Sequence, residues 1–258
     1  MSPWLEKPRS YWDLSGKRVF AIIGMMRSGS NFLERTLDGL PEVMCHGELF
    51  NHQFIGFQHQ RADSYAGYDK GGVKKRDDDL SSFVRNVLKS SEKPVVGFRI
   101  FGEHHTNALA KTLFDARIAK IILTRNYLEA FVSLCIARQT DQWIVLHPGT
   151  QKNVDQLNLD ADQFKDFVIQ NLSFYRETFE TLAQTDQQCM IVDYSELNAA
   201  PTINQITTYI GASSRIDMIK EVTVRQNPAP IYRKIGNYDE ILRLMQKGEF
   251  CRYILKIK

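Results

Sequence analysis

The stretch VFAIIGMMRSGSNFLERTLDGL, residues 19–40, decides the fold class of this chain. Its first five residues, Val19 to Ile23, are apolar, as expected of a buried strand. After the turn, apolar and small side chains recur at helical spacing, at Phe32, Leu33, Thr36, Leu37 and Leu40. A strand, a short glycine-bearing turn and a helix, in this order, place main-chain amides at a helix N-terminus, where they can bind an anion.

The turn GMMRSGSN, residues 24–31, lacks the lysine of the nucleotide-binding pattern G-x-x-x-x-G-K-[ST]. Arg27 offers instead a planar fork of N–H donors that suits phosphate-like oxygens. Ser28, Ser30 and the amides around Gly29 are placed to surround the neighbouring group. The turn therefore predicts an anion site that needs no metal, although a tight turn of the same composition without a ligand is common.

Strands and helices alternate along the rest of the sequence. This pattern predicts an α/β protein, a P-loop-like three-layer fold with a central, mainly parallel sheet flanked by helices. Ligands bind at the carboxyl ends of such strands, so the loops after residues 23, 100, 124 and 193 should converge. We expect strands at 18–24, 94–100, 119–124 and 189–193, and helices at 30–39, 80–90, 106–114, 127–140, 160–185 and from 201 to Gly211.

Length and composition indicate a single domain over residues 1–258, with 43% hydrophobic and 24% charged residues. A net charge of +3 favours a small anionic ligand and argues against a nucleic-acid partner. The self-cancelling run KKRDDD, residues 74–79, is typical of a solvated loop. Residues 51–80 show no periodicity, which predicts a mobile insertion near an acceptor site.

The cysteines and the apolar runs of the sequence indicate the cellular compartment in which the protein works. The four cysteines show no CxxC or Cys/His ligand spacing, which predicts neither a metal site nor disulfides. The polar N-terminus carries no apolar core of a signal peptide, and no apolar run is long enough for a membrane span. We expect a cytoplasmic protein, with a homodimer as the default assembly.

A second segment, ILTRNYLEAFVSLCIARQTDQW, spans residues 122–143. Arg125 follows an expected strand, and Ser133 comes eight residues later, about two turns into the next helix. The pair could hold a further phosphate. Taken alone, it is more typical of a surface arginine and a solvent-facing serine.

With both segments in order, the chain resembles the sulfotransferases that use 3′-phosphoadenosine-5′-phosphosulfate (PAPS). Their loop [KR]-S-G-[ST]-x-x-L, which binds the 5′-phosphosulfate, is similar to R-S-G-S-N-F-L at residues 27–33. Their strand-end arginine, with a serine eight residues on, binds the 3′-phosphate and is similar to Arg125 and Ser133. The chain is most similar to bacterial carbohydrate enzymes of the trehalose, Nod-factor and lipopolysaccharide type. The resemblance implies 5′-phosphosulfate contacts at Arg27, Ser28, Gly29, Ser30 and Asn31.

The segment CHGELFN, residues 45–51, bears on the general base. Sulfuryl transfer needs a group that accepts the proton of the attacking hydroxyl. The bacterial resemblance implies Glu48 for this role, and the animal cytosolic enzymes imply a histidine in the region of His104. Arg99, near the end of an expected strand, suits the transferred sulfonate or the acceptor.

The C-terminal half offers two weaker likenesses. VDYSEL, residues 192–197, resembles the Y-E-D-L element of the family and puts Tyr194 near the adenine, although Ser195 replaces the usual glutamate. IYRKIGNYDEI, residues 231–241, resembles a basic loop that closes on the 3′-phosphate, through Arg233 and Lys234. An exposed basic pair without a ligand is equally typical of such a sequence.

The resemblance implies transfer of a sulfuryl group from PAPS, leaving adenosine 3′,5′-bisphosphate (PAP), to a hydroxyl on a carbohydrate or glycolipid. A P-loop nucleotide kinase-like enzyme and a non-catalytic nucleotide-binding protein remain the alternatives. Neither the acceptor nor the base is decided by the sequence. Several aromatic and imidazole side chains could form a platform for the acceptor, or could equally be part of a local core. They are Phe50, Phe54, Phe57, Tyr65, Tyr68, Trp143 and His147.

Overall fold

The computed structural model describes residues 11–58, 63–145, 147, 149–152, 154–219 and 231–246. The chain divides into two compact units. Unit 1 comprises residues 1–25, 29–124 and 175–220, and unit 2 comprises residues 26–28, 125–174 and 221–258. The single domain expected from the sequence stays a prediction.

Unit 1 is built on a five-stranded parallel sheet. Its strands, in the spatial order β2-β5-β1-β6-β7, are Val43–Glu48, Val95–Phe101, Arg18–Gly24, Ile118–Thr124 and Met190–Asp193. Because every neighbouring pair is parallel, the carboxyl ends of all five strands lie at one edge. The α/β fold class is thereby confirmed.

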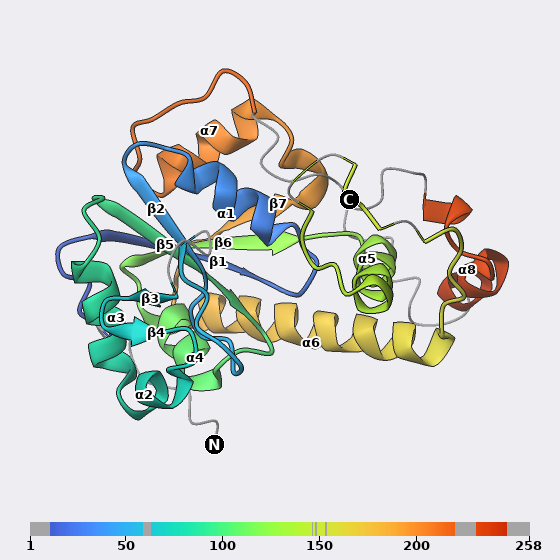
Figure 1. Cartoon of the computed structure of the whole chain (residues 1–258), viewed down its shortest axis with the longest axis horizontal. Coiled ribbons are helices and arrows are strands. Elements are labelled where there is room, and N and C mark those ends of the chain that lie inside the picture. The colour runs from blue at the N-terminus through green and yellow to red at the C-terminus, as the bar shows by residue number, and fades with distance from the viewer. Residues whose placement is uncertain are drawn as a thin grey trace. The chain divides into compact units, whose positions relative to one another are not determined.

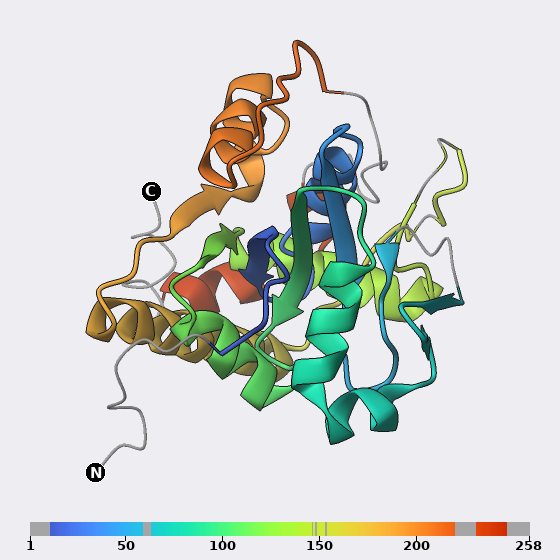
Figure 2. The same cartoon turned by 90° about the vertical axis from the view of Figure 1, so that its left-hand side faces the viewer.

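Helices cover both faces of this sheet, with α1 and α7 on one face and α3 and α4 on the other (Figures 1 and 2). The helices that lie wholly within unit 1 are α1 Ser30–Asp38, α2 Val73–Asp78, α3 Leu80–Lys89, α4 Thr106–Phe114 and α7 Ala200–Tyr209. Two short strands, β3 Ser64–Tyr65 and β4 Tyr68–Asp69, form a separate antiparallel pair. A 3-10 turn, Tyr194–Glu196, follows β7.

The core on the α1 and α7 face explains why the opening stretch folds as it does. Phe20 and Ile22 of β1 are buried against Leu33 and Leu37, which the helical spacing puts on one side of α1. Gly97 of β5 makes room for the Phe20 ring, since a Cβ atom there would lie 2.1 Å from that ring. Sequence periodicity and close packing thus agree on this face.

Unit 2 contains α5 Tyr127–Thr140, α8 Tyr238–Gln246 and the first part of α6 Ala161–Gln184. Phe131 of α5 packs on Phe164 and Phe167 of α6, with ring centroids 5.3 and 5.4 Å apart. A short 3-10 turn, Ile231–Arg233, precedes α8, and Leu157 pairs with Ile235 in an isolated bridge.

Most elements match the sequence predictions within one or two residues. Strand β2 and helix α8 were not predicted, and neither were β3, β4 and α2 within residues 51–80. One interpretation was wrong: residues 74–79 are no solvated loop, because residues 73–78 form α2 and Arg76 is fully buried. Because the positive and negative charges of this segment balance, its sequence does not indicate that the Arg76 guanidinium is buried.

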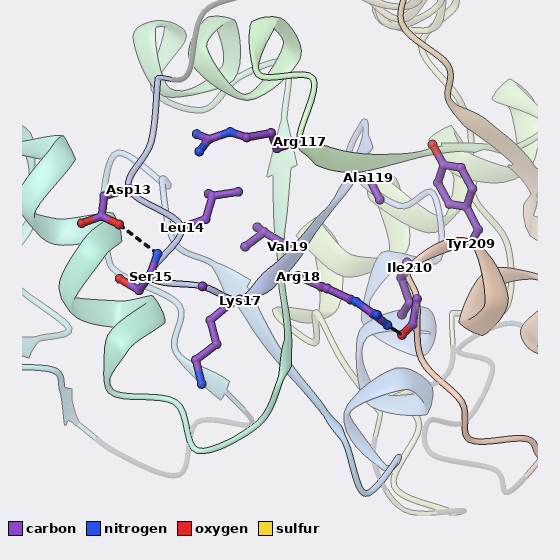
Figure 3. A pocket seen from close by; sticks show the side chains of 12 residues that line it. Asp13, Leu14, Ser15, Lys17, Arg18, Val19, Arg117, Ala119, Tyr209 and Ile210 are labelled. Atoms are coloured by element: carbon purple, nitrogen blue, oxygen red, sulfur yellow. Dashed lines mark hydrogen bonds between the residues drawn. The ribbon is translucent and has the colours of Figure 1, made fainter.

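The amino-terminal edge of the sheet holds a hollow of about 540 Å³ (Figure 3). Its three cations already have partners: Lys17 Nζ donates to Ser91 O at 2.8 Å, Arg18 donates to Gly211 O, and Arg117 donates to Trp12 O and the Asp115 carboxylate. The hollow lies at the opposite edge from the carboxyl ends of the strands, so we do not place the site there.

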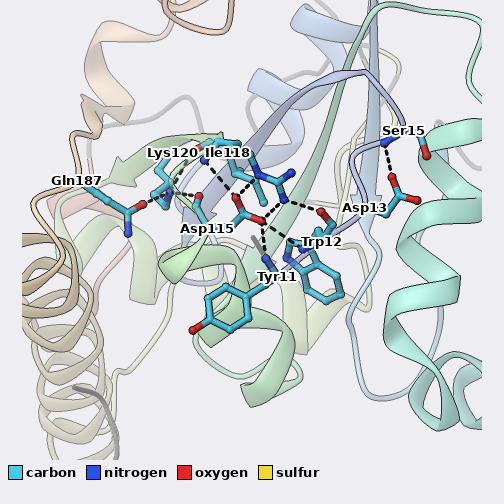
Figure 4. Close-up of polar contacts among 9 residues, drawn as sticks. Tyr11, Trp12, Asp13, Ser15, Asp115, Ile118, Lys120 and Gln187 are labelled. Carbon is cyan, nitrogen blue, oxygen red and sulfur yellow. Dashed lines mark hydrogen bonds and ion pairs between the residues drawn. The ribbon is translucent and has the colours of Figure 1, made fainter. Parts of the chain in front are cut away.

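The same edge is fixed by two buried polar groups, Asp115 and Lys120 (Figure 4). The Asp115 carboxylate accepts hydrogen bonds from the amides of Tyr11 and Trp12. Lys120 Nζ donates to the carbonyls of Asp115 and Ile118 and to the Gln187 side chain at 2.6 Å. These contacts join the start of the described chain to β6.

Candidate active site

The turn between β1 and α1 ends in a glycine at which any side chain would be strained. Gly29 is the N-cap of α1 and has a φ of 96°, a left-handed conformation. A Cβ atom there would lie 2.4 Å from the Tyr194 ring. Among the residues that the structure describes, no side chain caps this helix end. The Tyr194 ring therefore lies directly against Gly29, beside the first amides of α1, and amides at a helix N-terminus can bind an anion.

A bulge at the end of β2 aligns two charged side chains. Cys45 is in register with Gly97, but Glu48 is in register with Arg99, so β2 has one residue more than β5 over this step. Bulges of this kind re-aim side chains next to functional sites. Here the extra residue brings the Glu48 carboxylate to 3.5 Å from an Arg99 Nη2 atom.

The Glu48 carboxylate has further partners on its other oxygen. Asn51 Nδ2 donates to Oε2 at 2.8 Å, and His104 Nε2 lies 3.3 Å from the same atom. Burial by itself would raise the pKa of the Glu48 carboxyl. The hydrogen bond from His104, the Arg99 charge and the Asn51 hydrogen bond outweigh burial and lower that pKa to about 2. The group is thus an ionised carboxylate held by three donors.

The two candidate bases are partners in one contact. His104 is 3% exposed, and its Nδ1 atom accepts a hydrogen bond from the Phe101 amide at 3.2 Å. The proton of a neutral ring is then on Nε2, which donates to Glu48. Burial lowers the pKa of His104, and Glu48 opposes that effect. In this arrangement His104 acts as a donor to Glu48.

A second buried carboxylate, which the sequence analysis missed, completes the cluster. Glu34 of α1 is 4% exposed, and its Oε2 lies 2.6 Å from Arg99 Nε. Arg99 Nη1 also donates to Ser30 Oγ at 3.2 Å. Burial raises the pKa of Glu34, and the Arg99 charge offsets this only in part, so that pKa stays above its ordinary value. A signal was present in the sequence, because Glu34 follows Leu33 on the apolar side of the α1 helix.

In unit 2, Arg27 contacts both members of the predicted phosphate pair. Arg27 Nε donates to Ser133 Oγ at 3.0 Å, and Arg125 Nη1 donates to Arg27 O at 3.0 Å. Arg27 Nη1 also donates to Trp143 O at 2.7 Å. Arg27 has a φ of 66°, which is unusual for a residue with a side chain. Arg125 and Ser133 are thus brought to the same arginine.

Ser28 is the candidate with the least satisfied side chain. It is 2% exposed, and its hydroxyl has no hydrogen-bond partner among the described residues. A buried hydroxyl without a partner is costly. An anion held by the turn would supply the missing acceptor.

The C-terminal basic pair of unit 2 is engaged in local structure. Lys234 Nζ donates to Val154 O at 2.8 Å, and the Lys234 carbonyl accepts from the Leu157 amide. Arg233 is exposed, and its guanidinium lies 5.8 Å from the Tyr232 ring. The expected contact of this pair with a phosphate stays a prediction.

The side chains that could form an acceptor platform differ in burial, with Tyr65 half-buried and His147 exposed. Phe50, Phe57 and Tyr68 are buried among other side chains, so for them the local-core alternative holds. Phe54 and Trp143 are 40% and 44% exposed. In the described parts of the chain, no group of three or more His, Cys, Asp or Glu could hold a metal ion, and no helix is long and apolar enough to cross a membrane.

No protein-family model matches this chain. It is similar to nodulation protein H of Rhizobium tropici, with 22% identity over 251 residues, covering 93% of this chain and 94% of that protein. Nodulation protein H of Rhizobium meliloti strain 1021 is also 22% identical, over 243 residues. The match to proteins of nodulation agrees with the Nod-factor likeness of the motifs. The sulfotransferase resemblance is confirmed.

Solved structures of this class resemble the chain more distantly. One is a mouse sulfotransferase, SULT7A1 complexed with PAP. The match covers 98% of this chain and 91% of the mouse chain, with a TM-score of 0.49 and 10% identity. A sulfotransferase from Alicyclobacillus acidocaldarius gives a TM-score of 0.44 and 14% identity over 92% of this chain and 95% of that one.

Proposed function

We propose that this protein transfers a sulfuryl group from PAPS to a hydroxyl on a carbohydrate or glycolipid in the cytoplasm. The observation that carries the proposal is the Glu48 carboxylate, ionised and held by Arg99, His104 and Asn51 at the carboxyl end of a parallel sheet. Glu48 is the last residue of β2, the strand that follows α1, and the turn before α1 bears the predicted anion-binding motif.

The turn residues fit a bound phosphosulfate on two grounds. The Ser28 hydroxyl lacks a partner among the described residues, and the N-terminus of α1 has no side-chain cap. We assign the 5′-phosphosulfate to Arg27, Ser28, Gly29, Ser30 and Asn31. Arg125 and Ser133 are assigned to the 3′-phosphate, with Arg233 and Lys234 as further candidates, and Tyr194 to the adenine.

In the proposed reaction the acceptor oxygen forms a bond to sulfur while the bond from sulfur to the bridging phosphate oxygen breaks. PAP leaves with the electron pair of that bond, and negative charge grows on its phosphate. Arg27 and the α1 amides stabilise this charge. The proton of the acceptor hydroxyl passes to Glu48. A carboxylate of such low pKa is a weak base, so we expect proton transfer to come late, once the new bond has made the hydroxyl acidic.

Sulfur-35-labelled PAPS tests this function directly. The wild-type protein is incubated without metal with trehalose, chitotetraose and a glycolipid fraction, and label in each acceptor is counted. We expect label to move to one of these acceptors as PAP accumulates. Magnesium-dependent ATP turnover in the same panel, with PAPS untouched, would replace the proposal by a P-loop kinase.

A non-catalytic nucleotide-binding protein is distinguished by Glu48→Gln. If Glu48 is the base, transfer falls in this variant while PAP affinity is retained. Binding of PAP with no transfer in either protein would favour the non-catalytic alternative.

A further inference from the structure

Arg76 of α2 is a fully buried arginine that the reaction as described does not use. Its Nη1 atom donates to Leu49 O at 2.9 Å and to Asn51 O at 2.7 Å. Its Nε atom donates to Asp77 Oδ1 at 2.7 Å. The Nη2 atom of Arg76 has no hydrogen-bond partner among the described residues, so the contacts of Nε and Nη1 are the ones that hold this guanidinium in unit 1.

The contacts fall on the turn that follows Glu48. Three consecutive carbonyls, those of residues 49–51, each accept a hydrogen bond from another part of unit 1. Arg76 supplies the first and the third, and the His105 amide supplies the middle one, donating to Phe50 O at 3.1 Å. The turn is therefore held from two sides, by α2 and by the residue next to His104.

This turn carries one of the donors that hold the candidate base. Asn51 donates through its side chain to Glu48 Oε2, and its amide donates to Glu48 O at 3.3 Å. A chain of direct contacts thus runs from Arg76 through Asn51 to Glu48. If Arg76 released the turn, the Asn51 amide group would lose its fixed position against the carboxylate.

We propose that Arg76 is a positioning residue for Glu48, holding the turn at 49–51 so that Asn51 orients the carboxylate. The proposal rests on the proposed function for the role of Glu48. A lysine at this place keeps the positive charge but lacks the rigid fork of donors. Arg76→Lys therefore separates the geometric role of Arg76 from its charge.

The test is a carboxyl NMR titration of glutamate-labelled protein, with the Glu48 signal assigned by its loss in Glu48→Gln. Asn51→Ala removes a hydrogen bond to the ionised form, so we expect the Glu48 pKa to rise by about one unit. Arg76→Lys is expected to raise it by a similar amount. In the double variant the Glu48 pKa should rise no further than it does in Asn51→Ala, because both changes act through one contact.

Lys74→Arg is the matched control, since it exchanges the same two residue types at an exposed position of α2. It should leave the Glu48 pKa unchanged. A wild-type value in Arg76→Lys, or additive shifts in the double variant, would overturn the proposal. If Arg76→Lys fails to fold, Asn51→Ala alone decides, because an unshifted Glu48 in that variant breaks the chain of contacts.

The titration requires neither PAPS nor an acceptor. Failure of the proposed function would appear as absence of PAP binding with the Glu48 shifts intact. Failure of the positioning role would appear as unshifted Glu48 in a protein that still binds PAP.

Discussion

At the scale of the residue, the proposed proton transfer depends on the Glu48 side chain. Glu48→Gln keeps the shape of the group and its hydrogen bond from Asn51 but cannot accept a proton. We expect sulfuryl transfer to fall by about a hundredfold or more, with PAP affinity changed less than about twofold. The measurement is transfer of labelled sulfate alongside PAP titration. Equal transfer in the variant would remove Glu48 from the role of base and leave His104 as the candidate.

Glu92→Gln provides the control for that experiment, since Glu92 is exposed and follows α3, away from the cluster. Its rate of transfer should match wild type.

The residue scale also shows where sequence reasoning succeeds and fails. Glu48 and Arg99 were singled out because they stand in recognisable segments, CHGELFN and the end of a strand; the structure brings their side chains together, and their roles stay predictions. Glu34 and Arg76 were not, because their roles come from burial against residues distant in sequence. A charged residue on an apolar helix face, or within a balanced charge run, gives no sign of what it will contact.

At the scale of the element, the turn into α1 depends on Gly29. Gly29→Ala must accept a φ of 96° and a Cβ atom 2.4 Å from the Tyr194 ring. We expect a loss of about 1–3 kcal/mol of unfolding free energy from the strain, and PAP affinity at least about tenfold weaker, because the turn must shift. Chemical denaturation and PAP titration measure the two effects.

Gly16→Ala is a matched control, with a φ of 73° and nothing within 4 Å of the added Cβ. It shares the backbone strain but not the clash with Tyr194. If Gly16→Ala and Gly29→Ala lowered PAP affinity equally, the account of this turn would be wrong.

Lys120 of strand β6 should make the stability of the protein depend on pH. Burial lowers the Lys120 pKa from 10.5 to about 8, so the unfolded state binds more protons between these two values. The unfolding free energy should therefore rise with pH over that window, by up to roughly 3 kcal/mol at 1.36 kcal/mol per pKa unit. Urea unfolding at pH 8 and at pH 10 measures the change. Lys120→Met should lack the rise, and an equal rise in the variant would assign it to other groups.

Element prediction from the sequence worked where one period dominates. The helix at 127–140 and the strand at 18–24 were predicted with the bounds that the structure shows. Strand β2 was missed because His46, Gly47 and Glu48 interrupt its apolar pattern and its register breaks at a bulge. The short elements β3, β4 and α2 are fixed by contacts such as those of Arg76, which leave no periodic signal.

At the scale of the whole molecule, the parallel sheet explains why the motifs could be read together. Parallel strands bring their carboxyl ends to one edge, so an order of strands and helices was enough to predict that edge as the site. The sequence could not predict which groups surround each side chain. Examples are the Tyr194 ring that lies against Gly29 and the Arg76 guanidinium that binds the turn at 49–51. Those depend on tertiary packing.

The most direct test of the central claim is calorimetric titration with PAP, in parallel with ATP and magnesium, on wild type and on Arg125→Ala. The account predicts tight binding of PAP to the wild type, loss of at least about tenfold in affinity in the variant, and no comparable binding of ATP. A preference for ATP, or equal binding of PAP by the variant, would contradict a PAPS site built on this motif pair.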